Sequence, residues 1–328
     1  MSADDHGFAE KNIVTLPQYL EELNVEKDLA STLCQAASAC IEISAKLKTL
    51  PITSYLEDDV REGDTNVQGE IQKPMDVVAN EIFVNTLENH VAALASEEEE
   101  DIMFPFLPVR SGIGDYEKEH AFSKSGRNLL AAGYTVYSSS LELVISVTKE
   151  DGELIASGFT LADDQFLQRH SEWEENSGID ANKFILSRPN MKCPESGSYY
   201  SLNDGREPDW PLGLQKWIHD AKRGQTPSTT VYSSRYVCSL CADVHRTFIK
   251  GGWAGNPRPH LRLLYEAAPL AHIAEACGGR GSDGVRNLLD ITPKALHDRT
   301  SVFIGSRNDI RELESYGDVQ QCKKTYKV

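Results

Sequence analysis

The acidic run Glu97–Asp101 is the strongest chemical signal in the sequence, because five carboxylates stand together just after the apolar run Val91–Ala95. An apolar run of that length is typical of a strand. Carboxylates at the end of a strand can hold a divalent cation such as Mg²⁺, which prefers oxygen ligands. A solvated acidic turn is the plainer interpretation, and the pattern leaves both open.

A further carboxylate, Glu266, ends the segment Arg262–Glu266, just before a helix that Pro269 is expected to open. A carboxylate near a helix N-terminus is stabilised by the helix dipole, which would explain Glu266 without a ligand. Glu266 could equally be a second metal-binding carboxylate. Spacing does not choose between these interpretations.

The segment Ser234–Tyr236 pairs a guanidinium with a phenol, and Asp243, His245 and Arg246 follow it. Arginine and tyrosine side chains near backbone amides suit phosphate. An Arg–Tyr pair is more often structural, as is a single histidine. The segment is therefore a candidate phosphate site only in combination with other features.

The seven cysteines are odd in number and scattered, which suits a reducing compartment better than a disulfide framework. Cys238 and Cys241 form one C-x-x-C pair. A structural zinc site needs a second pair or a Cys/His partner at ligand spacing, and the sequence offers none. We therefore expect Cys238 and Cys241 to be two small buried residues on a helix.

The formal net charge of −17 makes nucleic acid a poor partner, since a strongly negative surface repels a phosphate backbone. A small phosphorylated substrate remains compatible, because local cations or bound metal ions can reverse the field inside one cleft. No apolar run approaches the roughly 18 residues of a membrane span, so no membrane partner is expected. The polar N-terminus resembles neither a secretory signal nor a transit peptide, which favours the cytoplasm.

Helical and strand patterns alternate along the chain, which predicts an α/β or α+β fold with layered sheets. Strands are expected at 91–95, 141–147, 155–161 and 184–186. Helices are expected at 16–50, where Pro51 should end the pattern, and at 76–87, 126–138, 236–250 and 270–277. We expect two halves, an N-terminal half at 1–190 with the acidic cluster and a C-terminal half at 191–328.

Eight segments between Val14 and Gly317 share a fixed order: 65–70, 75–83, 96–98, 126–134, 200–205, 235–237, 242–247 and 261–266. In that order they resemble the signatures of class I fructose-1,6-bisphosphatases of the cytosolic type. Each segment is weak by itself, but the ordered set is highly specific. The sequence is therefore identified as a member of this family.

The resemblance implies a layered α-β-α-β-α sugar phosphatase fold. It implies metal-dependent hydrolysis of fructose 1,6-bisphosphate to fructose 6-phosphate and phosphate, a step of gluconeogenesis and carbohydrate metabolism. Mg²⁺ or Mn²⁺ would be the cofactor. A homotetramer is expected by the same analogy.

The resemblance also assigns roles to residues of this chain. Glu97, Glu98 and Glu266 fall on metal ligands. Asp76, Glu98 and Glu70 fall on catalytic positions, with Glu70 standing where the family's mobile loop usually has an aspartate. Five residues fall on substrate-binding positions, and Arg235 among them would reach a neighbouring subunit: Asn203, Arg235, Tyr236, His260 and Arg262.

Three departures from the family pattern are visible. Only 27 residues separate Glu98 from Gly126, and they lack the motif Asp-Pro-Leu-Asp-Gly-Ser-Ser-Asn together with the central strand that follows it. A second, smaller gap lies at 253–260, and Arg206 replaces a tyrosine of the phosphate site. The segment Ala30–Cys34 lacks the Thr-Gly-Glu that receives AMP, so inhibition by AMP is not expected.

These departures keep two alternatives open. The first is a catalytically inactive paralogue that binds sugar phosphates or regulates active subunits. The second is a sedoheptulose bisphosphatase, suggested by the tail segments 282–284 and 298–300.

Overall fold

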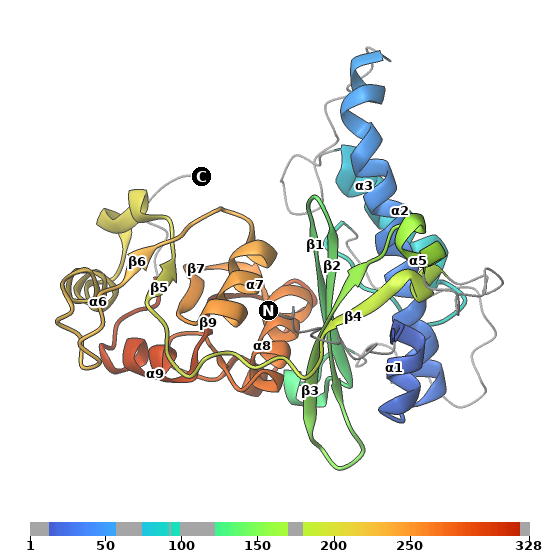
Figure 1. Cartoon of the computed structure of the whole chain (residues 1–328). Helices are drawn as coiled ribbons and strands as arrows, with labels where there is room; N and C mark the ends of the chain where they lie inside the picture. The colour runs from blue at the N-terminus through green and yellow to red at the C-terminus, as the bar shows by residue number, and fades with distance from the viewer. Residues whose placement is uncertain (1–12, 57–73, 92, 99–121, 170–179, 322–328) are drawn as a thin grey trace, which may run out of the picture.

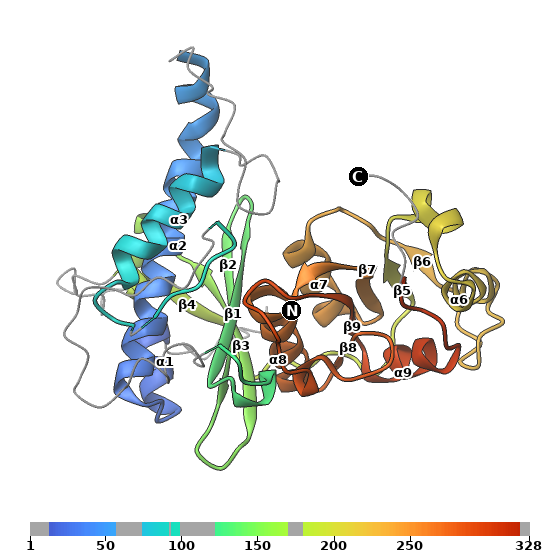
Figure 2. The same cartoon turned by 180° about the vertical axis from the view of Figure 1, so that it is seen from behind.

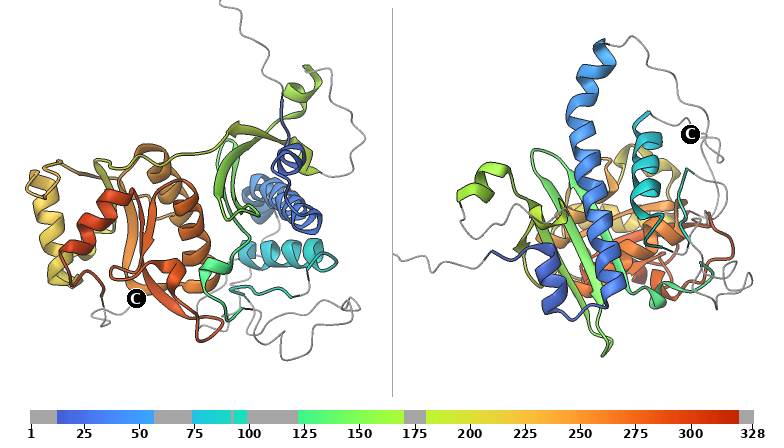
Figure 3. Two further views of the ribbon diagram at one scale, coloured as in Figure 1. Left: turned by 90° about the horizontal axis from the view of Figure 1, so that it is seen from below. Right: turned by 90° about the vertical axis from the view of Figure 1, so that its right-hand side faces the viewer.

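The computed structural model describes residues 13–56, 74–91, 93–98, 122–169 and 180–321. These residues form stacked layers in the order α-β-α-β-α (Figures 1 and 2). The view from below shows the alternation of helices and sheets most directly (Figure 3). The expectation of a layered α/β fold is thus confirmed. Among the described helices, none has both the length and the apolar character that crossing a bilayer requires.

The first layer contains α1 (Leu16–Glu22), α2 (Lys27–Leu56) and α3 (Pro74–Leu87). Thr15 caps α1: its hydroxyl accepts from the amide of Gln18 at 3.5 Å, and the Gln18 side chain accepts from the Thr15 amide at 3.0 Å. The expected helix end at Pro51 is wrong, because α2 continues to Leu56. An interior proline removes one hydrogen bond and crowds the preceding turn, but the helix continues past it here.

The second layer is an antiparallel sheet of β1 (Ala131–Tyr137), β2 (Leu141–Thr148), β3 (Leu154–Leu161) and β4 (Phe184–Arg188), in that order. The short helix α5 (Asp164–Arg169) follows β3. The expected strands at 141–147, 155–161 and 184–186 are confirmed.

The helix expected at 126–138 is wrong, because a short 3₁₀ turn (Gly126–Asn128) and then β1 occupy this segment. Ala132 and Tyr134 are buried while Gly133 between them is exposed, which is the two-residue period of a strand. Pairing with β2 along the whole length of β1 fixes the extended backbone.

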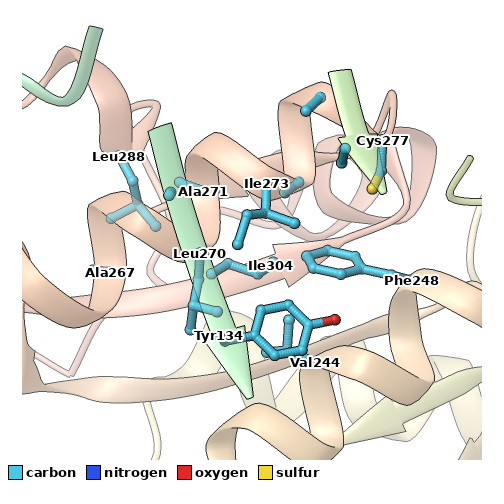
Figure 4. Close-up of a cluster of buried hydrophobic side chains, with 14 of the residues drawn as sticks. Tyr134, Val244, Phe248, Ala267, Leu270, Ala271, Ile273, Cys277, Leu288 and Ile304 are labelled. Carbon is cyan, nitrogen blue, oxygen red and sulfur yellow. The ribbon is translucent and has the colours of Figure 1, made fainter. Parts of the chain in front are cut away.

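The central layer contains α7 (Leu240–Lys250) and α8 (Ala268–Ala276). Their side chains meet β1 and β9 in the largest core, as Figure 4 shows for Tyr134, Phe248, Leu270, Ile273 and Ile304. As expected, α8 has Pro269 in its first turn. The helix expected to start at 236 starts only at Leu240. Cys238 has φ +66°, which an α-helix cannot include.

The expectation that Cys238 and Cys241 are both buried on a helix is therefore wrong for Cys238. Its side chain is exposed and precedes α7, whereas Cys241 is half-buried inside the first turn of the helix.

The fourth layer is a mixed sheet in the order β6-β5-β7-β9-β8. Its strands are β5 (Tyr199–Ser201), β6 (Ser233–Ser234), β7 (Trp253–Arg262), β8 (Arg280–Ser282) and β9 (Arg299–Gly305). The outer helices α6 (Leu212–Arg223) and α9 (Arg307–Ser315) cover its other face. Val302 and Ile304 of β9 face the central layer while Phe303 faces the outer one, so both faces of this sheet are buried.

The strand expected at 91–95 is wrong: of its described residues, only Leu94 takes part in a β-bridge. A strand persists only where a neighbour satisfies its backbone groups. The strand orders of the two sheets, β1-β2-β3-β4 and β6-β5-β7-β9-β8, do not include the described residues of 91–95. The segment 99–121, where the sequence leads us to expect that the family motif is missing, lies outside the described residues.

Candidate functional site

A cavity of about 160 Å³ lies beside β7 of the mixed sheet, and five polar side chains line it: Asn203, Arg206, Tyr236, Asn256 and Arg258. They come from three separate segments. Asn203 and Arg206 belong to the 3₁₀ turn after β5, Tyr236 precedes α7, and Asn256 and Arg258 are on β7. Two guanidinium groups, two amides and a phenol offer many donors to an anion with several oxygens. The cavity is thus suited to a phosphate group.

Tyr236 presents a protonated phenol to this cavity. Its side chain is 42% exposed, and its hydroxyl donates a hydrogen bond to the Sγ atom of Cys238 at 3.0 Å. Partial burial, followed by the bond to Cys238, raises the pKa of Tyr236 to about 12. The hydroxyl is therefore a donor, not an anion, at neutral pH.

A second polar cluster is centred on Arg262, the last residue of β7, whose side chain is only 5% exposed. Its guanidinium forms an ion pair with Glu97 through Nη2, and its backbone N–H donates to Oε2 of Glu266 at 2.6 Å. The distance from Nη1 to the same oxygen is 3.8 Å. The structure thus brings together three of the residues that sequence analysis singled out.

The backbone around Glu266 is unusual, since Leu263–Ala267 forms a single π-helical turn between β7 and α8. Single π-helical turns are frequent at functional sites. Here the turn lets the Glu266 carboxylate reach back to the amide of Arg262. Glu266 also lines a larger cavity of about 610 Å³ between β1, α7 and α8.

The other acidic candidates are placed less tightly. Glu98 is half-buried beside Glu97, and its amide donates to Oγ of Ser96 at 3.2 Å. Asp76 is exposed in the first turn of α3. Glu70 lies outside the described residues.

Carboxylates are the right class of ligand for a hard divalent cation. As they lie here, however, Glu97 and Glu266 are already engaged by one buried guanidinium. In the part of the chain that the structure describes, no group of three or more His, Cys, Asp or Glu side chains could hold a metal ion. The described carboxylates therefore do not make a complete metal site, and we derive no catalytic step through a metal.

Three of the five substrate-binding candidates do not line the phosphate cavity: Arg235, His260 and Arg262, which belongs to the second cluster. Arg235 is exposed, stacks over the ring of Tyr199 at 5.3 Å and donates to the carbonyl of Ser234 at 2.7 Å. His260 is half-buried on β7, two residues beyond Arg258.

Arg258 is a lining residue that sequence reasoning missed. The available signal was a cation between Pro257 and Pro259, within a segment that reads as a shortened loop. The structure instead continues β7 through both prolines, with an irregular register against β9 between Asn256 and Leu261.

A five-layered α/β fold with a cationic cavity and a carboxylate–arginine cluster along one strand defines the class of sugar phosphatases. A family profile described as "Fructose-1-6-bisphosphatase, C-terminal domain" matches residues 193–318. The chain is 34% identical to a class 1 fructose-1,6-bisphosphatase of Sorangium cellulosum over 292 residues, covering 77% of this chain and 78% of that protein.

It is also 32% identical to a chloroplastic fructose-1,6-bisphosphatase of Brassica napus, covering 89% of this chain and 78% of that protein. The crystal structure of Leishmania major fructose-1,6-bisphosphatase in holo form has a TM-score of 0.79 at 26% identity. The match covers 94% of this chain and 100% of that one. The chain belongs to the fructose-1,6-bisphosphatase family.

Proposed function

We propose that the chain binds fructose 1,6-bisphosphate and hydrolyses it to fructose 6-phosphate and phosphate, with Mg²⁺ or Mn²⁺ as cofactor. The convergence of Asn203, Arg206, Tyr236 and Arg258 on one cavity carries the proposal. Charge-assisted hydrogen bonds from arginine are the strongest that a phosphate finds in a protein. The proposed role of this cavity is to hold the phosphate that is not cleaved.

The strand β7 connects that cavity to the Arg262 cluster. Arg258 and Arg262 are four residues apart on it, which at the rise of a strand is about 13 Å. A ligand with a phosphate at each end could therefore contact both groups at once. The guanidinium of Arg262 would then neutralise the reacting phosphate, and Asn203 and Tyr236 would orient the sugar.

The proposed metal ligands are Glu97, Glu98 and Glu266, and the proposed catalytic residues are Asp76, Glu98 and Glu70. Uncatalysed hydrolysis of a phosphate monoester is among the slowest biological reactions, so turnover should depend strictly on the added cation. An incomplete ligand set would show itself as a weak metal affinity.

The exposed position of Arg235 supports a homo-oligomer, since its side chain is outside its own subunit's cavity and accessible to another. A tetramer is the proposed assembly. The C-terminal half, 191–328, contains every residue that lines the phosphate cavity. The cytoplasm is the proposed location, with the chloroplastic relatives as the competing case.

The deciding experiment is phosphate release from fructose 1,6-bisphosphate by the purified full chain, with Mg²⁺ varied from none to saturation. We expect turnover that Glu98→Gln abolishes. Arg258→Leu should raise KM by about tenfold or more, since a charge-assisted hydrogen bond contributes about 1.5–3 kcal/mol. Arg311→Leu, an exposed arginine on α9, is the matched control and should leave KM unchanged.

Two outcomes would contradict parts of this proposal. Folded protein that binds fructose 6-phosphate without turnover would be an inactive sugar-phosphate-binding paralogue. Faster turnover of sedoheptulose 1,7-bisphosphate than of the fructose compound would change the substrate.

A further inference from the structure

Cys238 is the one exposed cysteine among the six that the structure describes, because Cys241 is half-buried and the other four are buried. Cys238 lies in a bend directly before α7, and Cys241 is the second residue of that helix. Two cysteines separated by two residues at the start of a helix are the arrangement of a reactive dithiol.

Tyr236 connects the thiol of Cys238 to the proposed substrate cavity. The Tyr236 hydroxyl, which lines the cavity, donates its hydrogen bond to Sγ of Cys238 at 3.0 Å. Any chemical change at this sulfur therefore alters the partner, and hence the orientation, of a residue that would contact the sugar phosphate.

The two thiols differ in reactivity. Cys241 is half-buried in the first turn of α7, which limits its access to an oxidant in solution. Cys238 is open to solvent and accepts a hydrogen bond from the Tyr236 hydroxyl. Cys238 is therefore the thiol that reacts first with an oxidant, and Cys241 is placed to resolve the product.

We propose that Cys238 and Cys241 form a reversible disulfide that weakens sugar-phosphate binding through Tyr236, an inference that rests on the proposed function of the cavity. The oxidant is hydrogen peroxide. The Cys238 thiolate attacks one peroxide oxygen, the O–O bond breaks, and hydroxide leaves, so that sulfur becomes a sulfenic acid. The Cys241 thiolate then attacks that sulfur and displaces hydroxide, and the two hydroxides take up the two thiol protons as water. A dithiol reductant reverses the reaction.

Disulfide formation must turn Sγ of Cys238 toward α7, because the two sulfurs have to come within about 2 Å of each other. Tyr236 then loses its acceptor. The net value of a neutral hydrogen bond predicts a loss of affinity of about fivefold.

The chemical test uses the full chain, treated with hydrogen peroxide and digested with trypsin. Cleavage after Arg235 and Arg246 releases both cysteines in the peptide Tyr236–Arg246. Its mass should fall by about 2 Da, for two hydrogens lost, and return after dithiothreitol. In Cys241→Ser, dimedone should label Cys238 as a trapped sulfenic acid. A peptide that stays reduced while peroxide oxidises other thiols overturns the proposal.

The binding test is calorimetry with fructose 6-phosphate on reduced and oxidised protein. Oxidised wild type should bind about fivefold more weakly. Cys238→Ser, which keeps an acceptor for Tyr236, should bind equally well before and after peroxide. Equal affinity of both wild-type forms overturns the regulatory role, and an absence of binding to reduced protein overturns both this inference and the proposed cavity.

Turnover separates the two proposals. If oxidation alters affinity as expected but fructose 1,6-bisphosphate is not hydrolysed, the dithiol inference stands and the proposed activity fails. If the protein hydrolyses fructose 1,6-bisphosphate but the peptide Tyr236–Arg246 is never oxidised, the proposed activity stands and the dithiol inference fails.

Discussion

At the scale of single residues, Arg262 decides what the carboxylate cluster can do. Its guanidinium is buried between Glu97 and Glu266. Among the ion pairs that the structure describes, it is the only positive charge that contacts both glutamates. A buried charge without its partner is costly, because neither water nor a counter-ion stabilises it. The two glutamates can therefore stay close together only while this cation, or another, lies between them.

Arg262→Leu should destabilise the fold by about 3 kcal/mol, toward the low end for a buried pair because Glu97 is one-third exposed. Millimolar Mg²⁺ should restore part of the loss, since a divalent ion can replace the missing charge. Urea unfolding with and without Mg²⁺ measures both effects, with Arg311→Leu as control. A variant that Mg²⁺ stabilises no more than wild type would contradict the role of these carboxylates as ligands.

Asp309 predicts a loss of stability as the pH rises. Burial raises its pKa from 3.8 to about 6, although Tyr232 and the amide of Gly197 donate to it at 2.8 and 2.7 Å. Between these values the folded state binds more protons than the unfolded state, so this group's contribution to stability is present below pH 4 and disappears above pH 6. Asp309→Asn should flatten the pH profile of unfolding in that window. An unchanged slope would show that Asp309 titrates normally.

His272 predicts the opposite slope. It is buried between Ser146 (Nδ1 to Oγ, 2.7 Å) and Thr148 (Nε2 to Oγ1, 3.0 Å), and burial lowers its pKa below 6.5. The folded state thus resists protonation, and stability should be lost as the pH falls below 6.5. His272→Gln should remove this acid sensitivity, measured by urea unfolding at pH 5 and pH 7. Equal sensitivity in the variant would place the titration elsewhere.

At the scale of elements, sequence patterns predicted those whose periodicity comes from burial. The strands at 141–147 and 155–161 were readable because both faces are apolar or small. The strand β1 was missed because Ala131, Ala132 and Gly133 favour neither a helix nor a strand by pattern, and its conformation is set by pairing with β2. The start of α7 was missed because one left-handed residue, Cys238, cannot be recognised from its side chain.

The helix α6 offers a test in which local preference and packing disagree. Glycine to alanine normally stabilises a helix by about 1 kcal/mol. At Gly213, however, a Cβ would lie 1.7 Å from the carbonyl oxygen of Gly317, so α6 and the C-terminal segment would have to separate. Gly213→Ala should therefore destabilise by several kcal/mol in thermal unfolding.

The matched control is Gly278→Ala, where nothing lies within 4 Å but φ is +82°. It should cost only about 1–2 kcal/mol, the strain of a left-handed alanine. If both variants lose the same amount, packing against Gly317 is not what requires glycine in α6.

At the scale of the whole molecule, the central helices join the two sheets into one cooperative unit. Phe248 of α7 packs in the core shared by β1, β2 and β9, whereas Phe159 of β3 packs toward α1 and α2. Phe248→Ala should cost about 3–5 kcal/mol and lower hydrogen-exchange protection in both sheets. Phe159→Ala should lower hydrogen-exchange protection mainly in the antiparallel sheet of β1 to β4. Loss confined to one sheet in Phe248→Ala would show that the layers unfold independently.

The residues of the site are far apart in the sequence, so their spacing does not predict which of them meet in the fold. Glu97 meets Arg262 only because β7 ends where the segment after α3 passes. Sequence analysis selected Asn203 and Tyr236 by resemblance, and the structure places both in one cavity with Arg258, which no motif had marked. The packing of the fold brings cations such as Arg258 into the cavity, and a sequence motif alone does not identify them.

The outer layer has an optical consequence. Three of the four tryptophans belong to one core between the mixed sheet, α6 and α9: Trp210, Trp217 and Trp253. The indole N–H groups of Trp217 and Trp253 are buried without a hydrogen-bond partner in the described structure, so their fluorescence should be blue-shifted. Tryptophan emission will thus report mainly on the unfolding of this layer. A thermal midpoint from emission below the midpoint from circular dichroism would show that this layer unfolds before the rest.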